Sequence, residues 1–239
     1  PGVVLTCYHV LKSVIEGKVS AQLLVFRFDY HMQEHRPVAN TGVEYILRDS
    51  DWLIDHAPDS LADLPGHEES PKPNELDYAL VRIVDSAGFP PSRGYTPLPD
   101  AEIPLDKRAK ITIIQHPGGN TILEAKGRFQ GFNGNTTRLR HTVPTRKGSS
   151  GAPCFDDQFH LIAIHQRAKV AVPAYVITQR LKLNGKYQLI SRPVQHDLPP
   201  DPISALVYGH SHPIVRKFLE DYNNAPFGGR DKQLDYLNT

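Results

Sequence analysis

The chain has 239 residues, enough for one large domain or two small ones. Its 27 lysine and arginine residues nearly balance 26 aspartate and glutamate residues, and a net charge of +1 gives no basic surface for nucleic acid. No run approaches the ~20 apolar residues of a membrane span, no signal peptide is recognisable, and two cysteines favour a reducing compartment. We therefore predict a soluble cytoplasmic protein that binds neither nucleic acid nor membrane.

Short apolar runs separated by turn clusters predict β structure over most of the first 180 residues. Without long helical patterns between them, such runs are typical of an all-β barrel or sandwich. Because an apolar run starts at residue 2 and no methionine precedes it, we expect the natural chain to extend further at this end. The predicted strands are 2–6, 21–28, 78–84, 111–114 and 161–164.

Polar and proline-rich stretches divide the chain. Residues 49–75 carry eight acidic side chains, and this charge pattern predicts a solvated loop. Five prolines within 86–104 predict a connection between two halves. Five more within 191–213 predict a linker, and 213–223 has apolar residues at helical spacing.

Three segments place a histidine, an aspartate and a serine beside predicted strands. His9 follows the first strand, Asp77 opens the 78–84 strand, and Ser150 lies in a glycine-bracketed turn. Acyl transfer needs these residue types, because a hydroxyl attacks, a base takes its proton, and a carboxylate orients the base. Taken alone, a histidine after an apolar strand is more often structural, and the alternatives for the other two segments are an acidic strand start and a turn. Their combination predicts Ser150 as the nucleophile, His9 as general base and acid, and Asp77 as the orienting group.

The glycines around the serine have a chemical role in the same hypothesis. Gly148 can turn its main-chain N–H beside that of Ser150, so both donors can bind a developing oxyanion. We interpret Cys7 and Cys154 as buried thiols rather than nucleophiles. The His210-Ser211-His212 stretch has no cysteine or acidic partner at ligand spacing, so we predict no metal and no cofactor.

These segments resemble the motifs of the trypsin-like (chymotrypsin-fold) serine peptidases. The resemblance covers residues 1–183 and implies a protease domain of two six-stranded antiparallel β-barrels with the active site in the cleft between them. Barrel 1 would span about 1–90 and barrel 2 about 104–183, with the first strands of barrel 1 lying before Pro1. The matching segments are Thr6-Cys7-Tyr8-His9, Asp77-Tyr78-Ala79-Leu80, Gly148 to Pro153, and the bacterial-type glycine-rich loop His116-Pro117-Gly118-Gly119.

A second resemblance lies near the C-terminus. Residues 225–234 are similar to the segment that opens the nucleotide-binding module of STAND-type signalling ATPases. This implies that 184–239 is a linker and helical extension towards a downstream ATPase or sensor module in the same chain, as in a defence sensor against viruses. An ordinary glycine turn before a helix is the alternative. No GxxxxGK[ST] loop occurs, so no ATPase activity can be located in this chain.

Two stretches resemble segments that form the primary pocket of glutamyl endopeptidases and of viral glutamine-cleaving proteases. They are residues 145–148 and 161–165. The resemblance implies that Thr145 and His165 bind a Glu, Asp or Gln side chain through a hydroxyl and an imidazole N–H. Gln166 and Arg167 would line the adjacent strand edge, where Arg167 adds positive potential or narrows the pocket. The alternative is that His165 is a core histidine.

Together these features predict a serine endopeptidase that cleaves protein or peptide substrates through an acyl-enzyme, as the regulated effector of an intracellular sensor. The alternative is a catalytically silent module that keeps the fold and binds peptides. A nucleic-acid-binding barrel would need a basic and aromatic surface pattern that this sequence does not have.

Overall fold

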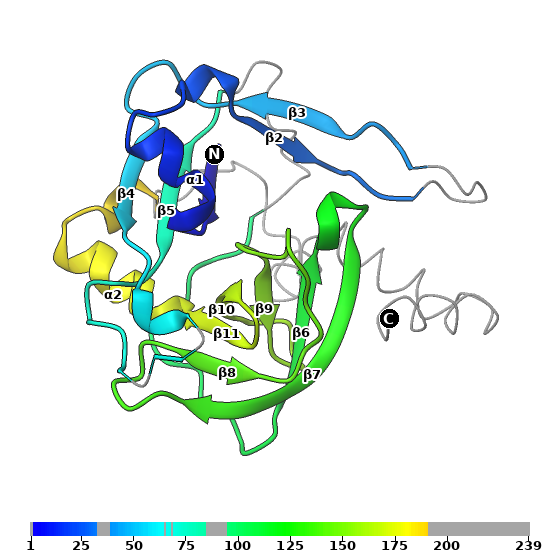
Figure 1. Cartoon of the computed structure of the whole chain (residues 1–239), viewed down its shortest axis with the longest axis vertical. Helices are drawn as coiled ribbons and strands as arrows, with labels where there is room; N and C mark the ends of the chain where they lie inside the picture. Colours follow the sequence, from blue (N-terminus) through cyan, green and yellow to red (C-terminus); the bar gives the residue numbers. More distant parts are fainter. Residues whose placement is uncertain (1, 33–38, 65, 68, 85–94, 191–239) are drawn as a thin grey trace, which may run out of the picture.

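A computed structural model describes residues 2–32, 39–64, 66–67, 69–84 and 95–190. The prediction of a mostly β fold is confirmed, since strands dominate both halves and only two α-helices occur in this part of the chain (Figure 1). None of its helices is long and apolar enough to cross a membrane. The predicted linker 191–213, the helix 213–223 and the 225–234 segment lie outside the described residues.

The C-terminal half is a closed antiparallel barrel. Its strands follow the order β10-β11-β8-β7-β6-β9, and β9 closes the ring by pairing with β10. Along β6, Ile111 and Ile113 face the barrel interior, where they pack with Phe129 and Leu139. This barrel matches the expected second barrel. Its strands are β6 (Lys110–Gln115), β7 (Leu123–Phe132), β8 (Leu139–His141), β9 (Pro153–Phe155), β10 (Leu161–Arg167) and β11 (Val170–Pro173).

Within the described residues, the strands of the N-terminal half do not close into a barrel. Its strands form a three-stranded sheet of order β1-β5-β4 and a separate hairpin of β2 and β3. Among the described residues, β1 pairs only with β5 and β2 pairs only with β3, so the ring stays open between them. Its strands are β1 (Val3–Thr6), β2 (Val25–Phe28), β3 (Val43–Ile46), β4 (Leu53–Ala57) and β5 (Tyr78–Arg82).

Two helices were not predicted. Helix α1 (Tyr8–Ile15) follows β1 directly and buries Tyr8 and Leu11. Its Val10, Val14 and Ile15 are β-branched, which favours strand in a purely local reading. Helix α2 (Ala174–Leu183) buries Ala174, Ile177, Thr178 and Leu181, the spacing of one helix face.

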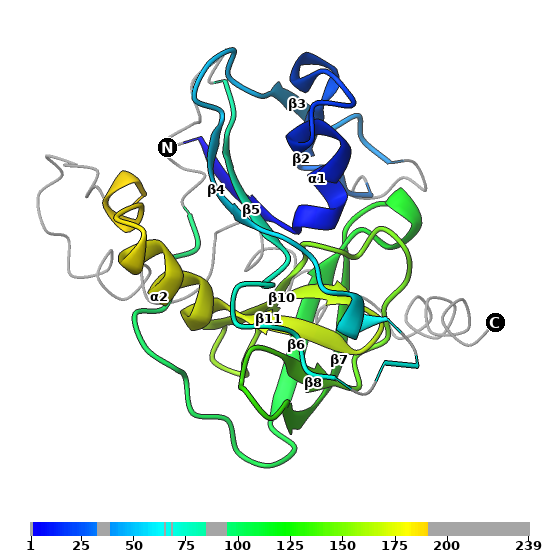
Figure 2. The same ribbon diagram turned by 60° about the vertical axis from the view of Figure 1, so that its left-hand side comes forward.

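A mixed hydrophobic cluster joins the two halves. It combines Leu76, Tyr78 and Leu80 of the N-terminal half with Ile164 and Val172 of the barrel, and α2 adds Ile177 and Leu181. Figure 2 shows α2 running from the barrel towards β4 and β5. The halves are therefore held in a fixed relation, and the segments that carry the candidate site meet along this boundary.

The acidic stretch 49–75 was expected to be a solvated loop, and this was wrong in part. It contains β4 and a short 3-10 turn at Leu61–Asp63. The Asp63 side chain is only 4% exposed because it pairs with Arg138 of the barrel at 2.7 Å.

Candidate active site

His9 and Asp77 meet where two chain segments change direction. Cys7 is the extended residue between β1 and α1, which places His9 in the first turn of α1. Asp77 immediately precedes β5 and is fully buried. One Asp77 carboxylate oxygen accepts from the His9 main-chain N–H at 2.9 Å, and the other lies 2.7 Å from Nδ1 of the ring. A proton on Nδ1 satisfies that contact and leaves Nε2 as an acceptor.

Ser150 lies on the other side of the imidazole. Its Oγ is 3.0 Å from His9 Nε2 and 2.8 Å from the main-chain oxygen of Gln166. The next residue, Gly151, has φ of +86°, and a Cβ there would lie 2.5 Å from Thr6 Oγ1. Only glycine allows the serine turn to approach the end of β1 this closely. The structure thus brings His9, Asp77 and Ser150 together from both halves.

The turn before Ser150 offers two main-chain donors. Among the described residues, neither the Gly148 N–H nor the Ser150 N–H donates a hydrogen bond. The Lys147 carbonyl accepts from Gly118 N–H at 2.6 Å. Because the peptide unit is trans, the Gly148 N–H points away from Gly118. Two free N–H groups beside a hydroxyl are the donor set that an oxyanion requires.

The His116–Gly119 loop supports that turn. Gly118 and Gly119 have φ of +68° and +73°, which glycine adopts without strain. Gly148 has φ of +95°. A Cβ on Gly148 would lie 2.9 Å from His116 O, and 3.1 Å and 3.0 Å from the amide nitrogens of Gly118 and Gly119. The close approach explains the glycine at 148, and the positive φ angles favour glycine at 118 and 119.

His165 belongs to a buried chain of hydrogen bonds. Val143 N–H donates to His141 Nδ1, and His141 Nε2 lies 3.2 Å from His165 Nδ1. Since Nδ1 of His141 is an acceptor, its Nε2 carries the proton and donates to His165. Nδ1 of His165 is therefore an acceptor, and its own proton is on Nε2. Within the described residues, that N–H has no hydrogen-bond partner.

Both histidines are held neutral. Burial lowers the pKa of His165 to about 3, with further lowering by His141 and His9. Burial lowers the pKa of His141 to about 4, and Lys169 lowers it further. At neutral pH each imidazole of the pair is therefore an uncharged hydrogen-bond donor, and the pair carries no positive charge.

The other three predicted pocket residues have different surroundings. Thr145 Oγ1 donates to the Ala168 main-chain oxygen at 2.8 Å, which ties the Thr145 segment beside the end of β10. The Gln166 side chain is fully buried and donates to Leu76 O, so it is not available to a substrate. Arg167 lies 3.7 Å from Asp59, which offsets its charge.

Both cysteines are free and buried. The Cys7 thiol donates to His165 O at 3.2 Å, and burial together with the Asp77 carboxylate raises its pKa well above the ordinary value. Burial raises the pKa of Cys154 as well. Cys7, His9 and Asp77 offer ligand atoms within 4.8 Å of one another. Both carboxylate oxygens already accept from His9, so this arrangement is satisfied without an ion.

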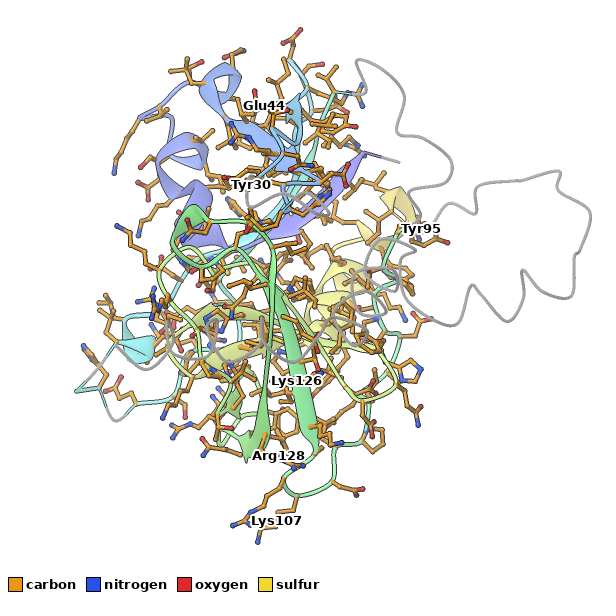
Figure 3. All side chains as sticks on the ribbon, turned by 90° about the vertical axis from the view of Figure 1, so that its right-hand side faces the viewer. Tyr30, Glu44, Tyr95, Lys107, Lys126 and Arg128 are labelled. Atoms are coloured by element: carbon orange, nitrogen blue, oxygen red, sulfur yellow. The ribbon has the colours of Figure 1, made fainter. Side chains whose placement is uncertain are left out.

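A hollow of about 490 Å³ opens between the β2–β3 hairpin and the His116–Gly119 loop. Figure 3 shows Tyr30 and Glu44 in this upper region, far from Lys126 and Arg128, which lie along β7 on the barrel. The hollow borders the loop that supports Gly148 and contains none of His9, Asp77 or Ser150. Its lining residues are Val25, Arg27, Tyr30, Glu44, His116 and Gly119.

Three partners of the site could not be found from the sequence. His141, Asp59 and Leu76 contact predicted residues from positions 24 to 108 residues away along the chain, and no spacing rule connects them. His141 was detectable only as a polar residue in a short strand.

A closed β-barrel packed against a second β half, with a serine, a histidine and an aspartate in hydrogen-bond contact between them, defines the class of the chymotrypsin-like proteins. The chain belongs to the family of the trypsin-like peptidase domain, whose family model matches residues 1–164. Deg5 has a similar fold, with 16% identity and a TM-score of 0.51 over 74% of this chain and 75% of that one. A serine endoprotease from Yersinia pestis is similar at 15% identity and a TM-score of 0.51, over 78% of this chain and 54% of that one. No curated sequence matches significantly.

Proposed function

We propose that this protein is a serine endopeptidase that cleaves protein or peptide substrates through an acyl-enzyme. The observation that carries the proposal is the position of the His9 ring, 2.7 Å from Asp77 and 3.0 Å from Ser150. His9 takes the Ser150 proton as the hydroxyl attacks the scissile carbonyl, and then donates it to the leaving amine. Asp77 holds the ring in the required tautomer, and the Gly148 and Ser150 N–H groups bind the oxyanion.

The two acceptors around Ser150 give the substrate a part in this step. In the free protein the hydroxyl is within reach of both His9 Nε2 and Gln166 O. A substrate main-chain N–H that bonds to Gln166 O competes for that acceptor. His9 is then the remaining acceptor for the serine proton, so binding prepares the nucleophile.

Labelling with a fluorophosphonate and hydrolysis of a peptide library test the proposal. We expect wild-type protein to be labelled and active. Ser150→Ala should lose labelling, and Ser150→Ala and His9→Ala should each lose on the order of 10⁴ or more in turnover. Substantial peptidase activity in Ser150→Ala would contradict the assignment. Peptide binding by an unlabelled, inactive wild type would favour the silent module instead.

The proposal includes a preference for Gln, Glu or Asp before the scissile bond, with Gln favoured. His165 offers a neutral Nε2–H donor at the pH of the cell. The Thr145 hydroxyl donates its hydrogen bond to Ala168 O, so the hydroxyl oxygen remains as an acceptor. A carboxamide presents an acceptor oxygen and an NH₂ donor group and fits both residues, whereas a carboxylate presents only acceptors and brings an uncompensated charge.

Matched peptides that differ only before the scissile bond, with Gln, Glu, Asp, Lys or Phe, test this preference. We expect the highest kcat/KM for Gln, then Glu and Asp, because a site built to hydrogen-bond a group rejects analogues without it. His141→Phe should reduce the Gln preference by freeing the His165 tautomer. A preference for Lys, Arg or a large aromatic residue would overturn this part alone.

The resemblance at 225–234 extends the proposal to regulation. The peptidase would be the effector part of a cytoplasmic sensor, with 184–239 leading to an ATPase module that controls access to the cleft. Peptide hydrolysis by the natural full-length protein should then respond to ATP. Equal rates with and without ATP would contradict this part.

A further inference from the structure

Gln166 occupies an irregular position in β10. His165 pairs with Ala171 and Arg167 pairs with Val170, so Gln166 is the extra residue of a β-bulge. Bulges occur beside active sites, where they redirect a side chain out of the regular alternation. Here the redirected side chain reaches the N-terminal half, and its Nε2–H donates to Leu76 O at 3.2 Å.

The peptide unit between Leu76 and Asp77 is consequently held at both ends. Its carbonyl accepts from Gln166, and its N–H donates to Pro58 O at 2.9 Å. Carbonyl and N–H project from opposite edges of a planar trans unit. Two bonds in opposite directions therefore fix the rotation of that plane.

Asp77 needs such support because its backbone is strained. Its φ of +47° lies in the left-handed region, which non-glycine residues keep only where the surroundings impose it. Both of its carboxylate oxygens are used by His9, one at the main-chain N–H and one at Nδ1. A rotation of the preceding peptide plane would misalign both contacts at once.

Filling space in the core does not explain a glutamine at position 166. It is fully buried, and its Oε1 has no hydrogen-bond partner within the described residues. Leaving an amide oxygen buried and unpaired is unfavourable. An apolar side chain of the same length would fill this space without that penalty, so packing alone does not explain the amide.

We infer that Gln166 is a positioning residue, whose side-chain amide clamps the Leu76–Asp77 peptide unit and so orients the Asp77 carboxylate on His9. The inference rests on the proposed peptidase function. The main-chain oxygen of Gln166 lies 2.8 Å from Ser150 Oγ. This contact is separate from the clamp, and substitution of the side chain leaves it in place.

Gln166→Met tests the clamp, because methionine keeps the length and removes both the donor and the unpaired oxygen. Thr178→Val is the matched control. Thr178 is also fully buried and donates one hydrogen bond to a main-chain carbonyl, Ala174 O, but it lies within α2. Both variants are compared with wild type in kcat, KM, thermal unfolding midpoint and the proton NMR signal of the His9 Nδ1–H.

We expect Gln166→Met to lower kcat by up to about 10²-fold, with KM unchanged, because only the alignment of the reacting groups is lost. Its unfolding midpoint should be no lower than that of Thr178→Val, and the His9 Nδ1–H signal should move or broaden. Thr178→Val should keep the wild-type kcat and signal.

An unchanged kcat and signal in Gln166→Met would overturn the inference. A loss of activity that follows a lower midpoint than in Thr178→Val would also overturn it, by making Gln166 structural. Absence of activity in wild type would contradict the proposed function instead, while the NMR comparison would still test the clamp.

Discussion

At the scale of single residues, the buried histidine pair makes the stability of the protein depend on pH. The pKa values of His165 and His141 are lowered to about 3 and about 4 from an ordinary 6.5. When the pH falls below about 6.5, these two imidazoles therefore bind protons in the unfolded chain but stay unprotonated in the folded chain. Their contribution to stability is complete above that pH and is lost as the pH falls through about 4 and then about 3.

We expect the free energy of unfolding, measured by urea denaturation, to decrease as the pH is lowered from 6.5 towards 4. His141→Gln removes one of the two groups, so the slope of this decrease should become smaller. His31→Gln serves as the control, because His31 is exposed. An identical slope in wild type and His141→Gln would show that the pair does not titrate in this way.

At the scale of elements, one buried ion pair attaches the Leu61–Asp63 turn to the residue that immediately precedes β8. Arg138 donates to both carboxylate oxygens of Asp63 and also to Glu75 O. The two side chains are 3% and 4% exposed. This contact fixes the segment that leads from β4 towards Asp77.

Arg138→Met should destabilise the protein by about 3–5 kcal/mol, because it leaves the Asp63 carboxylate buried without a counter-charge. The free energy of unfolding measures the loss. Arg140→Met is the matched control, since Arg140 lies two residues further along the chain, in β8, and is exposed, and it should change stability by less than about 0.5 kcal/mol. Equal losses in the two variants would argue against a buried pair.

The same elements show what sequence reasoning can reach. The strands at 2–6, 78–84 and 111–114 were predicted because apolar runs and turn residues are local signals. The proximity of His9, Asp77 and Ser150 followed from motifs whose flanking glycines and strand positions are also local. The burial of Asp63 was missed because its partner lies 75 residues away, and the same holds for Gln166 and Leu76, 90 residues apart. Contacts of this kind depend on the assembled fold, not on the spacing of nearby residues.

At the scale of the whole molecule, the mixed cluster makes the two halves depend on each other. Ile177 of α2 is completely buried where the N-terminal sheet meets the barrel. Neither half can lose this contact without exposing apolar surface of the other. We therefore expect a single cooperative unfolding transition for residues 1–190.

Ile177→Ala should lower the free energy of unfolding by about 2–5 kcal/mol and keep the transition single. Trp52, the only tryptophan, reports on the N-terminal half by fluorescence, and circular dichroism reports on all strands. The two probes should give coincident curves. Leu183→Ala is the control, because Leu183 is the last residue of the same helix and is 88% exposed. It should leave both curves unchanged. Separate midpoints for the two probes would mean that the halves unfold independently.

The two buried thiols have a practical consequence for chemistry performed on this protein. Thiols react with maleimides and iodoacetamide as thiolates, and burial keeps both native cysteines protonated and out of reach. A cysteine introduced at an exposed position such as Leu183 would then be the one thiol open to conjugation. A dye or a surface anchor could be attached there in a single, defined orientation, with neither native cysteine removed.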